Sequence, residues 1–523
     1  MKKNNTLLWK SDLGDGTYRN PVLHTDYSDP DVIRVGDTFY MTASSFNFVP
    51  GLPILVSKDL VNWKLVNYAV KHIPYEDYNK PAHGRGIWAP SIRYHNNKFY
   101  IYVGMPDEGI FMTYAEDPYG EWSPLVAVWE GKGYIDPCPF WDEDGRAYIV
   151  HAYAKSRIGF KSKLGIFSMD ESGTKCTSED RFIFDGTTTQ PTIEGPKVYK
   201  QHGYYYIFAP AGGVTNGWQT VLRSEHIYGP YEEKVVMHQG VTSVNGPHQG
   251  GLVNTSSGEA WFLHFQDKGV YGRIVHLQPV FWKDNWPIIG VSNSCSDIGE
   301  PVSEYKKPSG CEGYEDCVSC EAETSDDFCG EQLSLQWQWM GNSSESYYSL
   351  EERSGYLRLY HMPSESILWN RPNVLTQKVV GKEFQVIIKM DVSGMEDGDR
   401  AGIAMLGGEY AYQMLQKEQG KFFICYVEAV RRKGIMVEKL IRKVPMPEEW
   451  NDRELFIKVD FNIGGWLRFY MSSNGEDWTM ETAEYHLRKA LWVGGRIGLF
   501  ACGLKDSGKV GYTDFDYIRI KGK

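Results

Sequence analysis

The sequence lacks any apolar run of about 18 residues, the length that a membrane-spanning helix needs. It is also short of positive charge, because 55 lysines and arginines stand against 67 aspartates and glutamates, a net charge of −12. Nucleic acids and anionic membrane surfaces both require a basic face on the protein that binds them. We therefore expect neither a nucleic acid nor a membrane as a partner.

Cysteine is scarce, with nine residues in 523. That density is far below that of a disulfide scaffold, so we expect reduced thiols. Four cysteines gather between Cys311 and Cys329, but they form one C-x-x-C pair, whereas a zinc site usually uses two close pairs. The apolar run near the amino terminus, Leu7 to Trp9, is too short for a secretion signal, and we expect a cytoplasmic protein.

Motifs of several enzyme classes are absent as well. The chain has no P-loop, no H-E-x-x-H, no G-x-S-x-G and no G-x-G-x-x-G that opens a helix. What it has instead is aromatic side chains, with 34 Tyr, 23 Phe and 17 Trp making up 14% of the residues. Such side chains favour β-strands, and their flat apolar faces stack on sugar rings.

A short strand with a central aromatic residue recurs five times, and a proline precedes each aromatic by 10 to 14 residues. The aromatic residues are Tyr40, Tyr100, Tyr148, Tyr206 and Trp261, and the prolines are Pro30, Pro90, Pro137, Pro196 and Pro247. Each unit of about 55 residues holds several short strands, the pattern of a β-propeller blade. The chain is therefore predicted to be all-β, with a five-bladed β-propeller over residues 1–305.

The prolines indicate where a site would lie. The first strand of each blade lines the central axis, and proline suits the first residue of a strand because it lacks an N–H. The residues beside the five prolines should then converge on one funnel: Asp29, Trp88, Asp136, Glu194 and His248. Three carboxyl groups in one pocket repel one another, which raises a pKa and keeps one group protonated near neutral pH. Two carboxyl groups that flank a glycosidic bond can hydrolyse it.

Each of these residues also has a structural explanation. Aspartate before proline is a common turn residue, and Asp26 and Asp31 compete with Asp29 for the place at the axis. Glu194 could belong to a surface loop, and His248 could be a hydrogen-bonded core histidine. Their coincidence at one position of every repeat favours a functional site.

Several segments, in order over about the first 290 residues, resemble glycoside hydrolase family 43 in its β-xylosidase/α-L-arabinofuranosidase branch. They are NPVLHTDYSDPDVIRVGDTFYMTASSF, GLPILVSKDLVNW, GIWAPSI, IDPCPFWDEDG, IEGPK, NGPHQGG and LQPVFW. The resemblance implies an inverting mechanism on a five-bladed propeller. It implies Asp29 as general base, Glu194 as general acid and Asp136 as the residue that orients the acid and tunes its pKa.

The resemblance also implies residues around the sugar. Phe46 and Trp88 would be walls of the −1 pocket, and Arg273 would donate to sugar hydroxyls. His248 resembles the histidine beneath the site that often faces a water-coordinated calcium or sodium ion in the axis.

The last third of the chain has a different pattern. Residues 306–324 are polar and irregular, which predicts a linker. Alternating apolar and polar segments over 325–523 predict a β-sandwich. DDFCGEQLSLQWQW and TDFDYIRI, at its two ends, look like the concanavalin-like domain that follows the xylosidase propellers of the family. A loop of this domain is expected to close one side of the pocket.

These observations predict an inverting, exo-acting glycoside hydrolase that releases xylose, as a β-1,4-xylosidase, arabinose, as an α-L-arabinofuranosidase, or both. Its substrates would be short plant-derived xylo- or arabino-oligosaccharides. The alternative is a non-catalytic carbohydrate-binding protein, which would not need three carboxyl groups on one axis. The sequence does not choose between the two pentoses, and it is compatible with a homo-oligomer.

Overall fold

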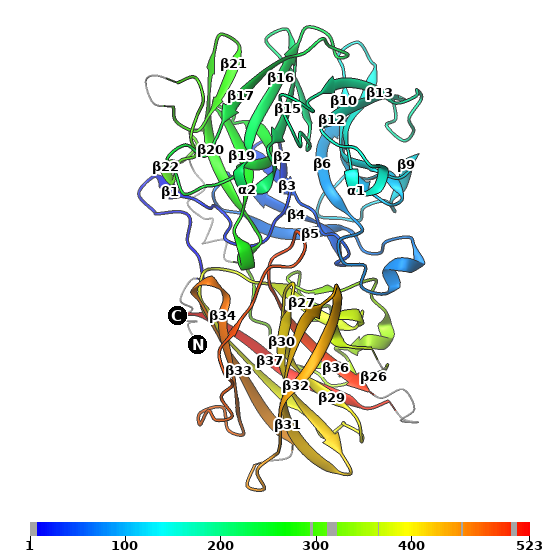
Figure 1. The fold of residues 1–523 in the computed structure, drawn as a ribbon, viewed down its shortest axis with the longest axis vertical. Coiled ribbons are helices and arrows are strands. Elements are labelled where there is room, and N and C mark those ends of the chain that lie inside the picture. Colours follow the sequence, from blue (N-terminus) through cyan, green and yellow to red (C-terminus); the bar gives the residue numbers. More distant parts are fainter. Residues whose placement is uncertain (1–7, 293–295, 311–321, 365, 451–452, 504–509) are drawn as a thin grey trace.

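The computed structural model describes residues 8–292, 296–310, 322–364, 366–450, 453–503 and 510–523. Figure 1 shows two bodies, a propeller in the upper half and a sandwich of two sheets in the lower half. The predicted all-β class, with a five-bladed propeller followed by a β-sandwich, is confirmed. Part of the predicted linker (311–321), with Cys311, Cys317 and Cys320, lies outside the described residues, and the predicted domain boundaries stay predictions.

Each blade is a four-stranded antiparallel sheet whose strands follow one another in the chain. Blade one consists of β2 (Asp31–Val35), β3 (Thr38–Thr42), β4 (Gly51–Ser57) and β5 (Lys64–Val70). Blade two consists of β6 (Trp88–His95), β7 (Lys98–Met105), β8 (Gly109–Ala115) and β9 (Val126–Glu130). Blade three consists of β10 (Tyr134–Trp141), β11 (Ala147–Tyr153), β12 (Lys163–Met169) and β13 (Arg181–Asp185). Blade four consists of β14 (Lys197–Gln201), β15 (Tyr204–Ala211), β16 (Trp218–Ser224) and β17 (Glu232–Met237). Blade five consists of β18 (His248–Asn254), β19 (Ala260–Asp267), β20 (Arg273–Lys283) and β21 (Trp286–Ile289).

The helices of the described residues are short. They are α1 (Lys155–Ile158), α2 (Gly213–Asn216) and the 3-10 helices η1 (Glu76–Asn79), η2 (Gly269–Tyr271), η3 (Glu345–Tyr347), η4 (Leu368–Asn370) and η5 (Ile463–Gly465). In the part of the chain that the structure describes, none of them could reach across a bilayer.

The amino-terminal segment closes the ring of blades. Strand β18 of blade five contacts β2 of blade one. Leu23 and Val275 exchange two backbone hydrogen bonds of 3.3 and 3.1 Å, which ties the segment before blade one to β20. Strand β1 (Thr17–Arg19) also pairs with β22 (Glu304–Lys306), which follows blade five in the chain. The two ends of the propeller sequence are therefore joined outside the blades.

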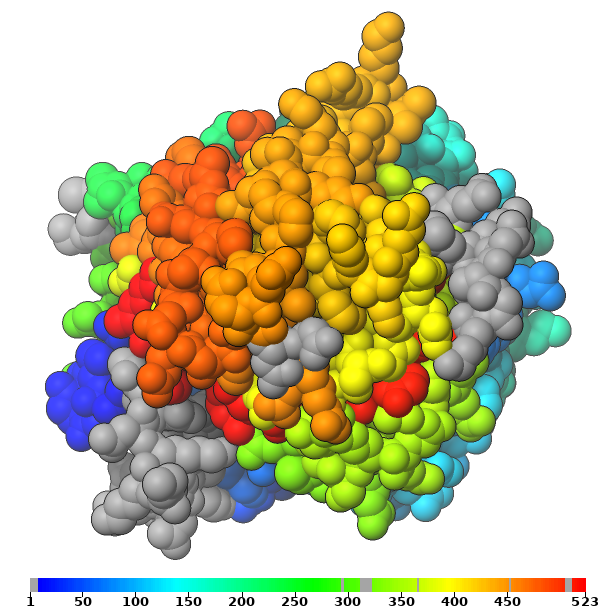
Figure 2. Space-filling model, turned by 90° about the horizontal axis from the view of Figure 1, so that it is seen from below, coloured from blue at the N-terminus to red at the C-terminus, as the bar shows by residue number. Residues whose placement is uncertain are grey.

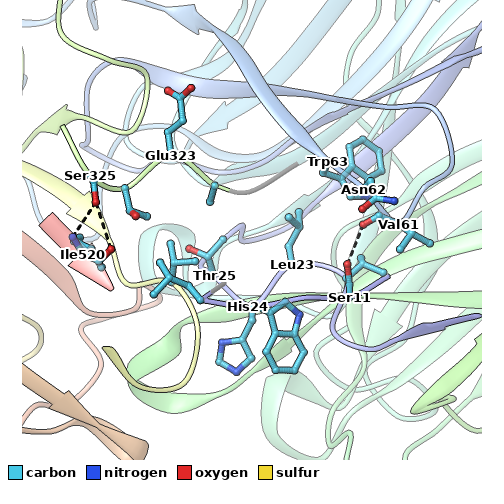
Figure 3. A pocket seen from close by; sticks show the side chains of 16 residues that line it. Ser11, Leu23, His24, Thr25, Val61, Asn62, Trp63, Glu323, Ser325 and Ile520 are labelled. Atoms are coloured by element: carbon cyan, nitrogen blue, oxygen red, sulfur yellow. Dashed lines mark hydrogen bonds between the residues drawn. The ribbon is translucent and has the colours of Figure 1, made fainter. Parts of the chain in front are cut away.

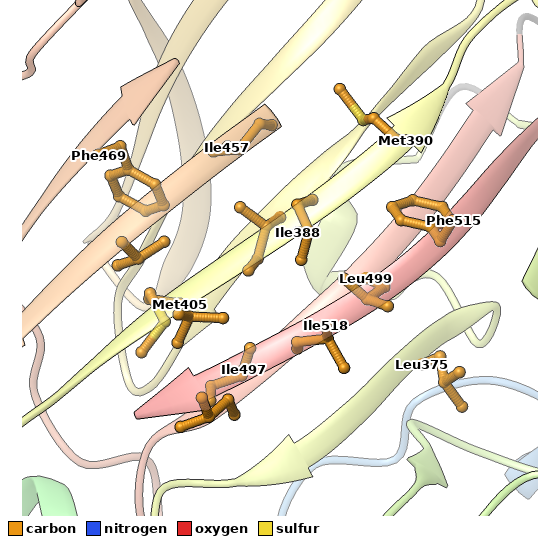
Figure 4. Close-up of a cluster of buried hydrophobic side chains, with 14 of the residues drawn as sticks. Leu375, Ile388, Met390, Met405, Ile457, Phe469, Ile497, Leu499, Phe515 and Ile518 are labelled. Carbon is orange, nitrogen blue, oxygen red and sulfur yellow. The ribbon is translucent and has the colours of Figure 1, made fainter. Parts of the chain in front are cut away.

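The sandwich consists of two sheets whose strands are mostly antiparallel. One sheet holds β23 (Gln338–Trp339), β26 (Met362–Pro363), β27 (Val374–Lys378), β29 (Arg400–Leu406), β30 (Tyr410–Glu418), β31 (Lys421–Arg432), β32 (Ile435–Pro445) and β36 (Arg496–Gly503). The other holds β24 (Tyr348–Ser349), β25 (Leu357–Tyr360), β28 (Phe384–Asp391), β33 (Glu454–Asn462), β34 (Trp466–Ser472), β35 (Tyr485–His486) and β37 (Tyr512–Gly522). Alternate residues, such as Ile388, Ile457 and Leu499, point between the sheets and form the core in Figure 4.

The sandwich and the propeller are packed together closely. Seen from below, the sandwich covers most of the propeller (Figure 2). Val49 of blade one and Trp339 exchange backbone hydrogen bonds of 3.1 and 2.6 Å, so the two domains share a short β-bridge. A cavity of about 250 Å³ remains at another part of the junction, where Leu23, His24 and Trp63 face Glu323 and Ser325 (Figure 3).

Candidate active site

Asp29, Phe46, Asp136 and Trp492 are among the residues near the propeller axis that have left-handed backbone conformations. The φ angles are 54° at Asp29, 53° at Phe46, 56° at Asp136 and 65° at Trp492. Side chains other than glycine adopt this region rarely, at a cost of order 1–3 kcal/mol each, and such strain concentrates at functional sites. At these four positions the fold therefore accepts backbone strain, and this strain orients the side chains near the axis.

The Asp29 carboxylate lies just before β2, and Pro30 stands between Asp29 and the strand. The Ser28 and Ser44 hydroxyls both donate to Oδ2, each at 2.6 Å. Arg273 at the start of β20 donates to Oδ1 at 2.9 Å, and its side chain is nearly buried. Three donors fix the orientation of this carboxylate, as a base that must hold one water molecule in place requires.

Glu194 and His248 form a second unit. The Nε2 atom of His248 lies 2.8 Å from Oε1 of Glu194, within hydrogen-bond distance. Glu194 lies three residues before β14 and its side chain is 28% exposed, whereas that of His248 is 1% exposed. The glutamate can therefore reach a ligand in the funnel while the buried imidazole orients it.

Asp136 lies between these two units, in a bulge of β10. Burial, and then the charges of Glu194 and Asp29, raise the pKa of this carboxyl group from 3.8 to about 8. The Gly195 N–H donates to Asp136 Oδ2 at 2.8 Å, and the buried Lys197 ammonium partly opposes the rise. At neutral pH Asp136 is mostly protonated. The prediction that one of the three carboxyl groups has a raised pKa agrees with this arrangement.

Three aromatic rings border the site. Phe46 and Trp88 lie 6.4 Å apart between ring centroids, as two walls of one pocket would. A third ring, Trp492, lies 4.6 Å from Trp88 and 6.2 Å from Phe46, nearly parallel to the latter. Trp492 belongs to the sandwich, in the connection between β35 and β36. The sequence predicted that a loop of this domain closes one side of the pocket, but it did not identify Trp492 as the residue that reaches the other two rings.

The two rivals of Asp29 have other partners. Asp31 is fully buried and forms an ion pair of 2.6 Å with Arg93. Asp26 accepts hydrogen bonds from two backbone N–H groups, those of Arg273 and Gly494. Neither carboxylate has the combination of hydroxyl donors and guanidinium that Asp29 has.

Two further residues act on Asp136, Gln249 by a contact and Lys197 through its charge, and neither was among the predicted site residues. Gln249 lies 3.4 Å from Asp136 through its amide nitrogen, and its φ angle is 29°. Lys197 is buried and donates to the Pro90 carbonyl at 2.9 Å and to the Ser91 hydroxyl at 2.7 Å. Both stand in segments that carried the family resemblance, IEGPK and NGPHQGG, which is the signal that could have found them.

The predicted ion has one candidate protein ligand. His248 uses Nε2 for Glu194, and its Nδ1 atom is buried without a hydrogen-bond partner. Within the described ranges, no three His, Cys, Asp or Glu side chains converge as a metal site would require. Since calcium prefers six to eight oxygen ligands, an ion at Nδ1 would be held mainly by water. The residues present fit such a weakly held ion.

Comparisons with known proteins agree with this geometry. The sequence pattern of "Glycosyl hydrolases family 43" matches residues 18–287, and that of "Beta xylosidase C-terminal Concanavalin A-like domain" matches residues 325–521. The chain belongs to glycosyl hydrolase family 43. It is thus a glycosidase of the β-xylosidase/arabinosidase type, and its family resemblance is confirmed.

Individual relatives of this family 43 chain are similar over most of their length. A putative β-xylosidase of Xylanibacter ruminicola is 39% identical, over 93% of this chain and 86% of the relative. A non-reducing end α-L-arabinofuranosidase of Bacteroides ovatus is 30% identical, over 76% of this chain and 75% of the relative. The crystal structure of the GH43 protein BlXynB from Bacillus licheniformis, 29% identical, superposes with a TM-score of 0.81 over 97% of this chain and all of that one.

Proposed function

We propose that the chain is an inverting, exo-acting hydrolase that releases xylose, arabinose or both from the non-reducing end of short oligosaccharides. One observation carries the proposal: burial, and then the charges of both Glu194 and Asp29, raise the pKa of Asp136. The three carboxyl groups therefore share one pocket, beside aromatic walls that suit a sugar ring. A protein that only bound sugars would not need this electrostatic cost.

The partners of each carboxyl group support distinct roles. Glu194 is the proposed acid, which gives its proton to the glycosidic oxygen as the bond from the anomeric carbon to that oxygen breaks. Asp29 is the proposed base, which takes a proton from the water whose oxygen bonds to the anomeric carbon from the opposite face. The product is a free sugar of inverted configuration and a shortened oligosaccharide. His248, whose Nε2 atom lies 2.8 Å from Glu194 Oε1, holds the acid in place between turnovers.

The aromatic walls support exo action. Trp492 reaches from the sandwich to Trp88 and Phe46, so residues of both domains contribute aromatic rings to the proposed pocket. A pocket closed in this way accepts the end of a chain and excludes its middle. Arg273 is the proposed donor to sugar hydroxyls. One of its terminal nitrogens donates to Asp29, the proposed base, and its buried Nε atom has no hydrogen-bond partner.

A water-coordinated calcium or sodium ion at His248 Nδ1 is part of the proposal. Such an ion would supply positive charge beneath the three carboxyl groups when it is bound. The Lys197 side chain acts in the same sense, because its charge lowers the pKa of Asp136. The cytoplasmic location and the homo-oligomeric state stay predictions.

The test is incubation with p-nitrophenyl β-D-xylopyranoside, p-nitrophenyl α-L-arabinofuranoside and xylobiose. Release of pentose from at least one supports the hydrolase, and proton NMR should show the anomer opposite to that of the substrate first. Initial appearance of the retained anomer would rule out the inverting mechanism. Binding of the sugars without release from any of them would favour the carbohydrate-binding alternative.

A further inference from the structure

Asp26 is a buried carboxylate, 7% exposed, at the junction of the propeller and the sandwich. Each of its oxygens accepts one backbone hydrogen bond. Oδ1 accepts from the N–H of Arg273 in the propeller at 2.8 Å, and Oδ2 accepts from the N–H of Gly494 in the sandwich at 2.9 Å. One side chain therefore joins two backbones that belong to different domains.

Both backbones lead directly into the site. The side chain of Arg273 donates to Asp29, the proposed base, at 2.9 Å. Gly494 follows Trp492 by two residues, and Trp492 is the ring that the sandwich contributes to the pocket. Asp26 thus stands between the residue that orients the base and the residue that closes the pocket.

The packing around Asp26 leaves these backbones little freedom. A Cβ atom added to Gly272 would lie 2.4 Å from Asp26 Cγ, and one added to Gly494 would lie 2.7 Å from the nitrogen of Gly272. Contacts under 3.0 Å essentially never occur for real Cβ atoms. The two glycines let these backbones pack closely against each other and against the carboxylate.

The loop that carries Trp492 has a second attachment to the propeller, and this one does not involve Asp26. Lys489 forms an ion pair of 2.6 Å with Asp267, at the end of β19. The side chain of Lys489 is 47% exposed, so the pair is a surface interaction of small energy. Asp267 offers a matched control, because it holds the same loop with the same kind of side chain but does not contact the base.

We propose that Asp26 is a positioning residue that couples closure of the pocket by Trp492 to alignment of the Arg273–Asp29 pair. The inference rests on the proposed hydrolase function and deepens it. Closure and alignment depend on one carboxylate, so perturbing it should change both substrate binding and turnover, whereas perturbing the loop alone should change binding.

The experiment compares Asp26→Asn, Asp267→Asn and Trp492→Ala in the full chain with p-nitrophenyl glycosides. An asparagine presents an NH₂ group to one of the two N–H donors, so one hydrogen bond is lost in a buried place. We expect Asp26→Asn to lower kcat by about tenfold or more and to raise KM, as the loss of a hydrogen bond to a charged group would. Trp492→Ala should raise KM by about tenfold with a smaller change in kcat. Asp267→Asn should change either constant by less than about threefold.

The double variant Asp26→Asn/Trp492→Ala separates coupling from independent damage. If Asp26 acts on binding through Trp492, the two KM effects overlap and the double variant shows less than their product. Multiplicative KM effects would overturn the coupling, and so would a kcat for Asp26→Asn equal to that for Asp267→Asn. Circular dichroism and thermal unfolding check that each variant is folded. Should Asp26→Asn fail to fold, Gly494→Ala displaces the loop from the other side, and a KM unchanged by it would equally refute the coupling.

Calorimetric binding of xylose and arabinose gives a readout without turnover. The dissociation constant of the sugar that the wild type binds should rise by about fivefold or more in Asp26→Asn and Trp492→Ala, and stay within about twofold in Asp267→Asn. A wild type that binds sugar but hydrolyses no glycoside refutes the proposed function. Equal affinities for wild type and Asp26→Asn refute the coupling even in an active enzyme.

Discussion

Replacement of Asp136 by asparagine should stabilise the protein while it damages the site. In the folded chain the pKa of Asp136 is about 8, against an ordinary value of 3.8, because the group is buried beside Glu194 and Asp29. At pH 7 the unfolded chain has therefore released a proton that the folded chain retains. One pKa unit corresponds to about 1.4 kcal/mol, so the roughly three units between 3.8 and pH 7 disfavour folding by about 4 kcal/mol.

The sign of the pH dependence follows from the same difference. Below about pH 4 both states hold the proton and Asp136 has no effect on stability. Between about pH 4 and pH 8 the folded state holds more protons, so this group makes stability fall by about 1.4 kcal/mol per pH unit. Above pH 8 its contribution is constant. Asparagine cannot ionise, and its carbonyl oxygen can still accept the hydrogen bond from the N–H of Gly195.

The assay is urea unfolding of wild type and Asp136→Asn at several pH values between 5 and 9. The variant should gain stability relative to wild type as the pH rises, by about 2–4 kcal/mol at pH 7, and should lose most of its hydrolytic rate. Asp144→Asn, on an exposed turn of the same blade, is the control and should show no such gain. A variant that is less stable at every pH, or a difference that does not change with pH, would contradict the assignment.

Three further predictions concern the proposed roles. Asp29→Ala should abolish release from every substrate, because the attacking water loses its base. A variant that releases p-nitrophenol as fast as the wild type would refute this role. Glu194→Ala should retain activity on aryl glycosides, whose leaving groups need little protonation, while losing activity on xylobiose; an equal loss on both would show that another group is the acid. Exhaustive dialysis against EDTA should lower the rate and shift its pH optimum, and added calcium should restore both; unchanged profiles would exclude a divalent ion at His248.

Much of the propeller could be predicted because each blade repeats the same local sequence pattern. A turn, a proline and an aromatic strand recur in register, and the blades follow those repeats closely. The repeat also indicated where Asp29, Asp136 and Glu194 converge, since position along a blade fixes distance from the axis. What it could not give was the partner of each side chain, such as the contact of His248 with Glu194.

Contacts between the domains could not be predicted in this way. Trp492 lies in a connection with no repeat, far along the chain from Phe46 and Trp88, and no local pattern shows that it returns to them. Asp26 was a rival of Asp29 by spacing alone. Its two hydrogen bonds come from backbone N–H groups, which every residue except proline has, so nothing in the sequence identifies Arg273 and Gly494 as its partners.

The wall of the pocket is built into the domain junction. Phe46 exchanges backbone hydrogen bonds of 2.9 and 3.0 Å with Ile87, and three residues later Val49 pairs with Trp339 of the sandwich. The strained φ of Phe46 is therefore held from both sides, by blade two and by the second domain. Arg496, at the start of β36 in the sandwich, places its guanidinium carbon 3.9 Å from the centroid of the Phe48 ring. Because the segment from Phe46 to Val49 contacts both blade two and the sandwich, its position depends on the junction of the two domains.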